Sequence, residues 1–138
     1  MSAEAELVGL WPLNAESGAS DVTGNGNDAV ARGTQLAPGP FGDTDGAFLF
    51  SGTVGSYLDI PNNGRLDVRY SHTVLAHIYP TGAAGPIFSY ITNGNDWGVH
   101  FFQTGPQELT HRYVYSVLHL YSKSFLGRHW HCGKRLQE

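Results

Sequence analysis

Glycine and proline punctuate this chain so often that short strands are favoured over long helices. The 138 residues hold 18 glycines and seven prolines, which are spread along the whole sequence. Glycine allows backbone conformations with positive φ and proline interrupts hydrogen-bonded ladders, so each dense group of these residues marks a turn. The apolar residues fall in short runs between these turns. The pattern predicts an all-β chain.

Alternation of apolar and polar side chains places the expected strands. Ser71–Pro80 alternates best, so it is expected to be a central strand. Leu7–Leu13 is expected to be a strand near a sheet edge, because Pro12 has no N–H to donate. Leu109–Leu120 fits either a further strand or, by the spacing of its leucines and tyrosines, a helix. The other expected strands are Ala29–Leu36, Ala47–Phe50, Ser56–Ile60, Gly85–Tyr90 and Gly98–Gln103.

The apolar phases of these strands predict the core. A chain of this length is large enough to bury a core without disulfide bonds. Its only cysteine, Cys132, cannot form one within the chain. The side chains expected to be buried are Trp11, Leu13, Phe48, Phe50, Leu58, Ile60, Val74, Ala76, Ile78, Phe88 and Phe101.

The net charge of −4 is distributed unevenly along the chain. Residues 1–106 contain ten acidic and three basic side chains, whereas residues 107–138 contain two acidic and five basic ones. Such a change in composition marks a boundary. We therefore expect a β-sandwich domain over residues 1–106 and a divergent basic C-terminal segment over residues 107–138. A tail, a variant exon and a changed reading frame all remain open as the origin of that segment.

Several segments resemble, in order, the laminin-G-like (concanavalin A-like) jelly-roll domain. They are LVGLWPLN from Leu7, DVTGNGND from Asp21, GAFLFSG from Gly46 and YLDIPNN from Tyr57. SHTVLAHIYP and IFSYITNGNDWGVHFFQ are similar to the family's middle strands. The resemblance covers about residues 7–103 and implies an antiparallel β-sandwich with jelly-roll topology. No counterpart of the family's late closing strand is visible, so we expect a sandwich that is incomplete at its C-terminus. Its unpaired sheet edge would invite self-association.

The resemblance also implies a class of function. It indicates a non-enzymatic recognition module that binds a glycan or an extracellular protein, on a larger protein outside the cell or at its surface. No signal peptide is visible in the chain itself. Two alternatives remain open: a glycan-processing enzyme or its accessory domain, and a truncated domain without independent function.

Carboxylates and amides gather in the Asp21–Asp28 loop. Asp21, Asn25, Asn27 and Asp28 supply the oxygen ligands that Ca²⁺ prefers, within a segment that glycines make adaptable. The resemblance implies a structural calcium site here, formed together with loop carbonyl groups. The spacing is not that of an EF-hand, and the alternative is that these residues simply form turns.

A second polar loop suggests a carbohydrate site. Trp97 follows Asn93, Asn95 and Asp96, and sugar sites on jelly rolls combine an aromatic platform with polar side chains. The alternative for Trp97 is a core side chain at the start of a strand.

Other chemistries find little support in the sequence. His129, His131 and Cys132 are of metal-ligating types, but no second cluster completes a tetrahedral set, so a solvated basic tail is the simpler interpretation. There is no G-x-S-x-G motif, no P-loop spacing and no strand with alternating carboxylates. The few basic residues do not favour a nucleic-acid partner. No apolar run is long enough to predict membrane insertion.

Overall fold

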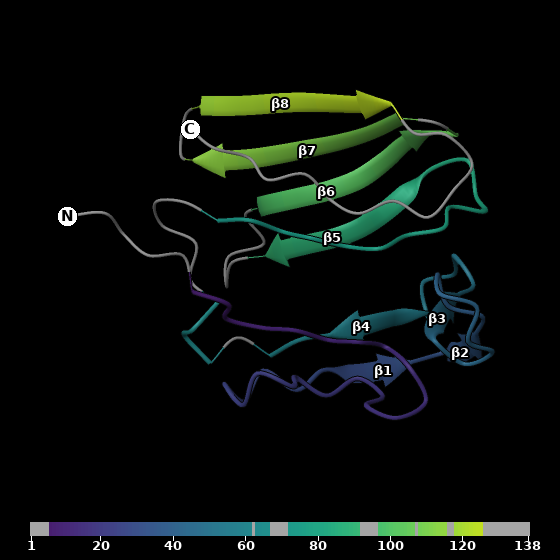
Figure 1. Cartoon of the computed structure of the whole chain (residues 1–138). Coiled ribbons are helices and arrows are strands. Elements are labelled where there is room, and N and C mark those ends of the chain that lie inside the picture. The colour runs from purple at the N-terminus through teal and green to yellow at the C-terminus, as the bar shows by residue number, and fades with distance from the viewer. Residues whose placement is uncertain are drawn as a thin grey trace. The chain divides into compact units, whose positions relative to one another are not determined.

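The computed structural model describes residues 6–61, 63–66, 72–91, 97–106, 108–115 and 118–125. The regular elements in these ranges are all β-strands, and every pair of neighbouring strands is antiparallel (Figure 1). The prediction of an all-β chain is therefore confirmed for the described residues. The chain divides into two compact units. The first contains the described residues up to Thr73, and the second contains those from Val74 onward.

Two short ribbons form the sheets of the first unit. They join residues far apart in sequence: Val30 lies opposite Asp59 in one ribbon, and Thr34 lies opposite Phe50 in the other. Glycine is required between β1 and β2, because Gly33 has φ 56° and an added Cβ would lie 2.5 Å from the Gly55 carbonyl oxygen. The ribbons are β1 (Val30–Arg32) with β4 (Tyr57–Asp59), and β2 (Thr34–Ala37) with β3 (Ala47–Phe50).

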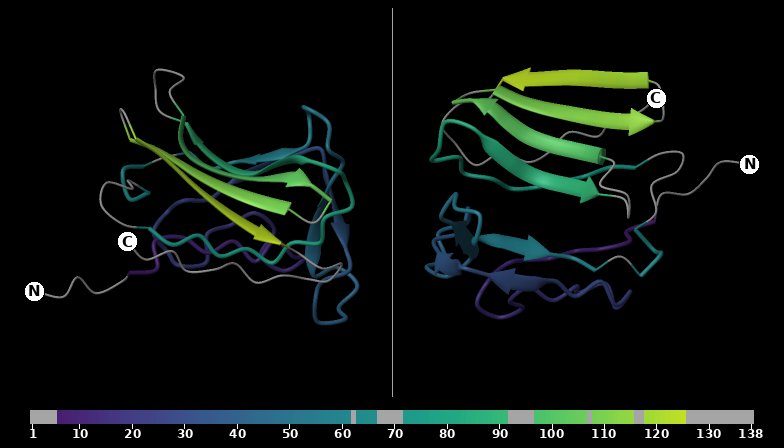
Figure 2. Two further views of the ribbon diagram at one scale, coloured as in Figure 1. Left: turned by 90° about the horizontal axis from the view of Figure 1, so that it is seen from above. Right: turned by 180° about the vertical axis from the view of Figure 1, so that it is seen from behind.

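A four-stranded meander forms the second unit. Figure 2 shows its strands as one twisted sheet, in the spatial order β5-β6-β7-β8. The described part of the run Leu109–Leu120, which fitted either a strand or a helix, belongs to two consecutive strands of this sheet. The strands are β5 (Gly85–Ile91), β6 (Trp97–Gly105), β7 (Glu108–Tyr115) and β8 (Leu118–Phe125).

The expected change of domain at residue 106 falls between β6 and β7, which pair with each other. Val99 lies opposite Tyr113, and Gln103 lies opposite Leu109. The residues from Glu108 to Phe125 that the structure describes therefore continue the sheet. A separate origin for residues 107–138 stays a prediction. Residues 126–138 lie outside the described part of the chain.

The strand expected at Leu7–Leu13 does not form. The segment finds its hydrogen-bond partners in the Asp21–Asp28 loop rather than in a neighbouring strand. The Leu10 N–H donates to the Asp21 carboxylate, and the Leu10 carbonyl oxygen accepts from the Val22 N–H. Its extended course ends at Leu13, whose φ of 54° is left-handed. Hydrogen bonds to the Asp21 side chain and to the Val22 backbone thus take the place of the expected ladder.

The prediction of a central strand at Ser71–Pro80 is also wrong. Ser71 lies outside the described residues, and in His72–Pro80 only Ile78 makes a bridge. The alternation itself is present: Val74, Ala76 and Ile78 are half-buried, and the residues between them are exposed. Periodicity therefore gave the correct inward phase, but a strand also needs a neighbour to complete its ladder.

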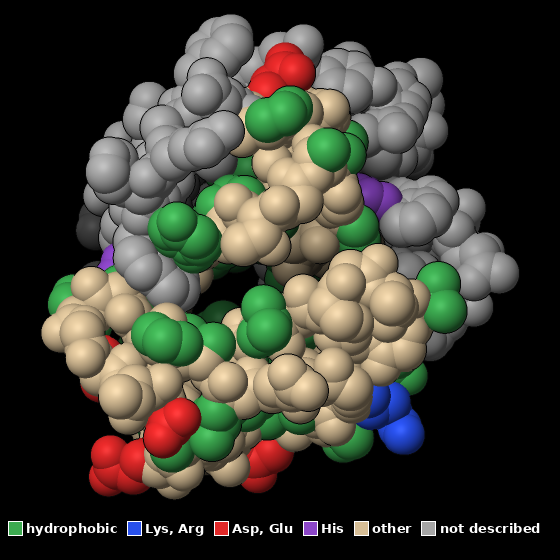
Figure 3. Space-filling model, turned by 90° about the vertical axis from the view of Figure 1, so that its right-hand side faces the viewer, with side chains coloured by type: hydrophobic (Ala, Val, Ile, Leu, Met, Phe, Trp, Pro, Cys, Tyr) green, Lys and Arg blue, Asp and Glu red, His purple; other side chains and the backbone are tan. Residues whose placement is uncertain are grey.

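Few apolar side chains are buried among the described residues. Val99 and Leu109 are buried. No residue of the expected core is buried as deeply, and Phe50 is 40% exposed. Ten of the eleven expected core residues are half-buried, so the expectation that these side chains are mostly buried fails only at Phe50. Figure 3 shows hydrophobic side chains at the surface of one face. The most exposed include Leu7, Phe41, Val54 and Leu75.

Candidate functional site

The carboxylate of Asp21 organises the loop that follows it. Its Oδ1 accepts hydrogen bonds from the Leu10 N–H (3.1 Å), the Thr23 N–H (3.0 Å) and the Thr23 hydroxyl (2.7 Å). Its Oδ2 accepts from the Asn27 N–H (3.2 Å). Because Asp21 is only 7% exposed, water competes little for these donors. One side chain thus fixes both ends of the loop and attaches it to the segment around Leu10.

These hydrogen bonds also keep Asp21 charged. Burial of the carboxylate raises its pKa, but the Thr23 hydroxyl and the backbone N–H groups of Leu10, Thr23 and Asn27 outweigh that effect. The net result is a pKa well below the ordinary value of 3.8. A carboxylate that accepts several N–H bonds is stabilised in its charged form, so Asp21 carries its negative charge at neutral pH.

Asn27 is the most deeply buried polar side chain of the loop, at 0% exposure. Its Nδ2 donates to the Val8 carbonyl oxygen (2.8 Å), and the backbone carbonyl oxygen of Asn27 accepts from the Trp11 indole N–H (2.8 Å). Its Oδ1 is buried and has no hydrogen-bond donor in the described part of the chain. Buried acceptors in folded proteins nearly always have a partner, so this oxygen is the position in the loop that most favours a ligand.

The two remaining members of the expected calcium site serve the same loop. Asn25 Nδ2 donates to the Val8 carbonyl oxygen (3.3 Å) and the Thr23 hydroxyl (3.0 Å), so an amide nitrogen, not an oxygen, faces these groups. Asp28 Oδ1 accepts from the Asp21 N–H (2.8 Å), while the side chain itself is exposed. The sequence was right to group these residues, because the loop brings all four together.

The fit of this loop to calcium is partial. Both Asp21 oxygens accept backbone N–H groups, so the carboxylate with the best burial is already engaged. Asn27 Oδ1 and the second oxygen of Asp28 have capacity left for a hard cation, as does Asn25 Oδ1, which accepts one long hydrogen bond. No group of three His, Cys, Asp or Glu side chains suited to a metal occurs in the ranges that the structure describes. Calcium binding stays a prediction.

The turn at Asn63 contacts the loop, which the sequence gave no reason to expect. Asn63 Nδ2 donates to the carbonyl oxygens of Asn25 (3.0 Å) and Gly26 (3.3 Å). The Arg65 guanidinium also donates a hydrogen bond to Asn25 Oδ1 (3.4 Å). These residues are far apart in sequence, so only the folded chain reveals the contact. An Asn-Gly pair such as Asn63-Gly64 favours a turn, and that is the only signal this segment offers in the sequence.

The expected sugar site falls largely outside the described residues. Asn93, Asn95 and Asp96 lie there, as do His129, His131 and Cys132. Trp97 is the first residue of β6, and the structure describes its backbone alone. The assignment of Asn93, Asn95, Asp96 and Trp97 to a glycan therefore stays a prediction.

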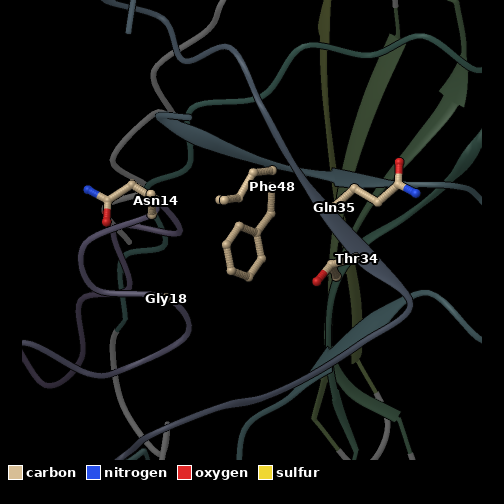
Figure 4. A pocket seen from close by; sticks show the side chains of 7 residues that line it. Asn14, Gly18, Thr34, Gln35 and Phe48 are labelled. Atoms are coloured by element: carbon tan, nitrogen blue, oxygen red, sulfur yellow. The ribbon is translucent and has the colours of Figure 1, made fainter. Parts of the chain in front are cut away.

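A shallow pocket of about 260 Å³ lies in the first unit, against β2 and β3. Figure 4 shows the Phe48 ring and the Thr34 hydroxyl directed toward it, while the amides of Asn14 and Gln35 point away. A sugar site needs polar groups that converge on one position. The polar groups of this pocket do not converge in that way, and no titratable side chain lines it.

Comparison of the chain with models of protein families, with curated proteins and with solved structures finds no match. No helix among the described residues could span a membrane. Function must therefore be argued from the loop and the sheets themselves.

Proposed function

We propose that this protein is a non-enzymatic recognition module that binds a glycan or an extracellular protein through its loops. The observation that supports it best is the Asp21 carboxylate, which holds the Asp21–Asp28 loop in one conformation through four hydrogen bonds. A loop that is ordered before binding loses less conformational entropy when a ligand arrives. Loops that a rigid scaffold positions are the usual place for binding residues. The resemblance to the laminin-G-like jelly roll supports the same class of function.

A glycan array, run with calcium and with a chelator, tests this proposal. The purified chain is expected to retain a defined subset of glycans and to release no cleaved product from them. Product release would instead support a glycan-processing enzyme. If no glycan is retained, an array of extracellular-matrix proteins decides between a protein ligand and no ligand, and failure on both arrays would refute the proposal.

The exposed apolar side chains favour a second candidate, a domain without independent function. Phe41 is 84% exposed and Val54 is fully so, and large exposed apolar surfaces mark contacts with other polypeptide or a tendency to aggregate. Size-exclusion chromatography at several concentrations separates this candidate from the first. An aggregated chain supports the second candidate, whereas a discrete monomer or dimer supports a functional module, the dimer through the unpaired edge expected from the sequence.

Calcium, as part of this proposal, acts structurally by binding at Asn27 and Asp28. We expect thermal unfolding in millimolar calcium to occur at a higher temperature than in EDTA. A ligand that binds only the folded state at a hundredfold excess over its Kd contributes about 2.7 kcal/mol. Coincident unfolding curves would rule out the calcium site.

Two substitutions make this calcium test specific. Asp28→Asn should reduce the gain from calcium, because it removes a charge but keeps an oxygen that can accept from the Asp21 N–H. Asp43→Asn, an exposed acid in another loop, should leave the gain unchanged. An equal gain in both variants would place the cation elsewhere.

A further inference from the structure

Asn63 links two loops through its side-chain amide. Its Nδ2 donates to the carbonyl oxygens of Asn25 and Gly26, and its Oδ1 accepts from the Arg65 N–H (3.0 Å). The side chain is nevertheless exposed to water. We call this set of hydrogen bonds the Asn63 clasp, because it joins the Asn63–Arg65 turn to the Asp21–Asp28 loop.

The residue after Asn63 makes its amide chemically vulnerable. Gly64 has no Cβ, so its backbone nitrogen meets little steric hindrance in approaching the Asn63 Cγ. The Arg65 N–H on Oδ1 draws electron density from that carbonyl and would stabilise the negative charge that develops on the oxygen during attack. The exposed position admits the water needed to complete the reaction.

We propose that Asn63 is a site of spontaneous deamidation, and that this modification opens the Asn63 clasp. The Gly64 nitrogen loses its proton and bonds to the Asn63 Cγ, the bond from Cγ to the amide nitrogen breaks, and that nitrogen leaves with a proton as ammonia. The cyclic succinimide is then hydrolysed by one water at either carbonyl, giving aspartate or isoaspartate. The balance is one water consumed and one ammonia released, without oxidant or reductant.

The product cannot make the same contacts. A carboxylate at position 63 has only acceptors, so both donor bonds to the loop are lost. Its negative charge would face the carbonyl oxygens of Asn25 and Gly26, which repel it. In the aspartate product the bond from the Arg65 N–H survives, because it needs only an acceptor. Deamidation to aspartate therefore detaches the Asp21–Asp28 loop while the turn itself remains, whereas isoaspartate also lengthens the backbone of the turn by one methylene.

The Asn25-Gly26 pair provides an internal comparison, since it has the same two residue types. Asn25 is partly buried, and its Nδ2 donates to the carbonyl oxygens of Leu7 and Val8 and to the Thr23 hydroxyl. Its Oδ1 bond to the Arg65 guanidinium is long, at 3.4 Å. Asn25 is less exposed than Asn63, and among the described residues its Nδ2 makes three hydrogen bonds where that of Asn63 makes two, so we expect slower reaction at Asn25.

Peptide mapping by mass spectrometry tests the site. The full chain is incubated at 37 °C at mildly alkaline pH, with and without urea, and conversion of both asparagines to acid is followed over time. In the folded chain Asn63 is expected to convert several times faster than Asn25, and in urea the two rates should converge. Equal rates without urea, or faster conversion at Asn25, would overturn the proposed site.

Hydrogen exchange tests the effect on the clasp. Asn63→Asp reproduces one product directly, and Gln35→Glu adds the same charge at an exposed position that makes no side-chain hydrogen bond to the loop. We expect Asn63→Asp to speed exchange in the peptide covering residues 21–28 several-fold, and Gln35→Glu to leave it unchanged. Unchanged exchange in Asn63→Asp would show that deamidation does not open the clasp.

Discussion

Replacing Asp21 with alanine is expected to lower the free energy of unfolding by about 3 kcal/mol. The substitution leaves the backbone N–H groups of Leu10, Thr23 and Asn27 without their acceptor. Asn27 is fully buried, so water cannot readily replace the lost bond there. Urea unfolding followed by tryptophan fluorescence measures the loss. Asp43→Ala, which removes an exposed acid from another loop, should change stability by less than about 0.5 kcal/mol.

The stabilisation from Asp21 should also depend on pH, in a direction fixed by its lowered pKa. The folded chain holds the carboxylate charged more strongly than the unfolded chain does, so protons bind preferentially to the unfolded chain. The contribution is complete above the ordinary pKa of 3.8 and is lost as the pH falls below it toward the folded pKa. Wild-type and Asp21→Ala proteins should therefore differ most near neutral pH and approach each other in acid. A difference that stays constant down to acid pH would show that the charge is irrelevant.

Replacing Leu109 with alanine is expected to cost about 2–4 kcal/mol, the second large effect. Leu109 lies on β7 between β6 and β8 and is 6% exposed, so its removal leaves a cavity in the sheet's packed face. Leu75→Ala is the matched control, because Leu75 belongs to the same unit and is 63% exposed. The control should lose less than about 1 kcal/mol. Equal losses for the two variants would contradict the assignment of Leu109 to the core.

Local pattern predicted the strands that pair with near neighbours or end in clear turns. Ala47–Phe50 matches β3, and Gly85–Tyr90 nearly matches β5, because each is a short, largely apolar run next to glycines. Ser71–Pro80 alternates better than either of these runs, yet only Ile78 in its described part makes a bridge. Alternation reports which side chains face inward, whereas strand formation depends on a partner elsewhere in the chain.

The candidate site was predictable in its membership but not in its bonding. Proximity in sequence was enough to group Asp21 with Asn25, Asn27 and Asp28. The use of the Asp21 carboxylate as an acceptor for Leu10, and the approach of Asn63 to the loop, depend on contacts between distant segments. A single sequence carries no signal for such contacts when the residues involved are ordinary turn formers.

Amide hydrogen exchange by NMR tests the role of Asp21 as organiser of the loop most directly. At neutral pH the N–H groups of Leu10, Thr23 and Asn27 should be protected in the wild-type chain, because each donates to the carboxylate. In Asp21→Ala all three should lose protection together, while the Leu109 N–H in the second unit keeps its own. Wild-type exchange of these three amides at the rate of an unstructured peptide, or protection that survives the substitution, would contradict a loop fixed by Asp21.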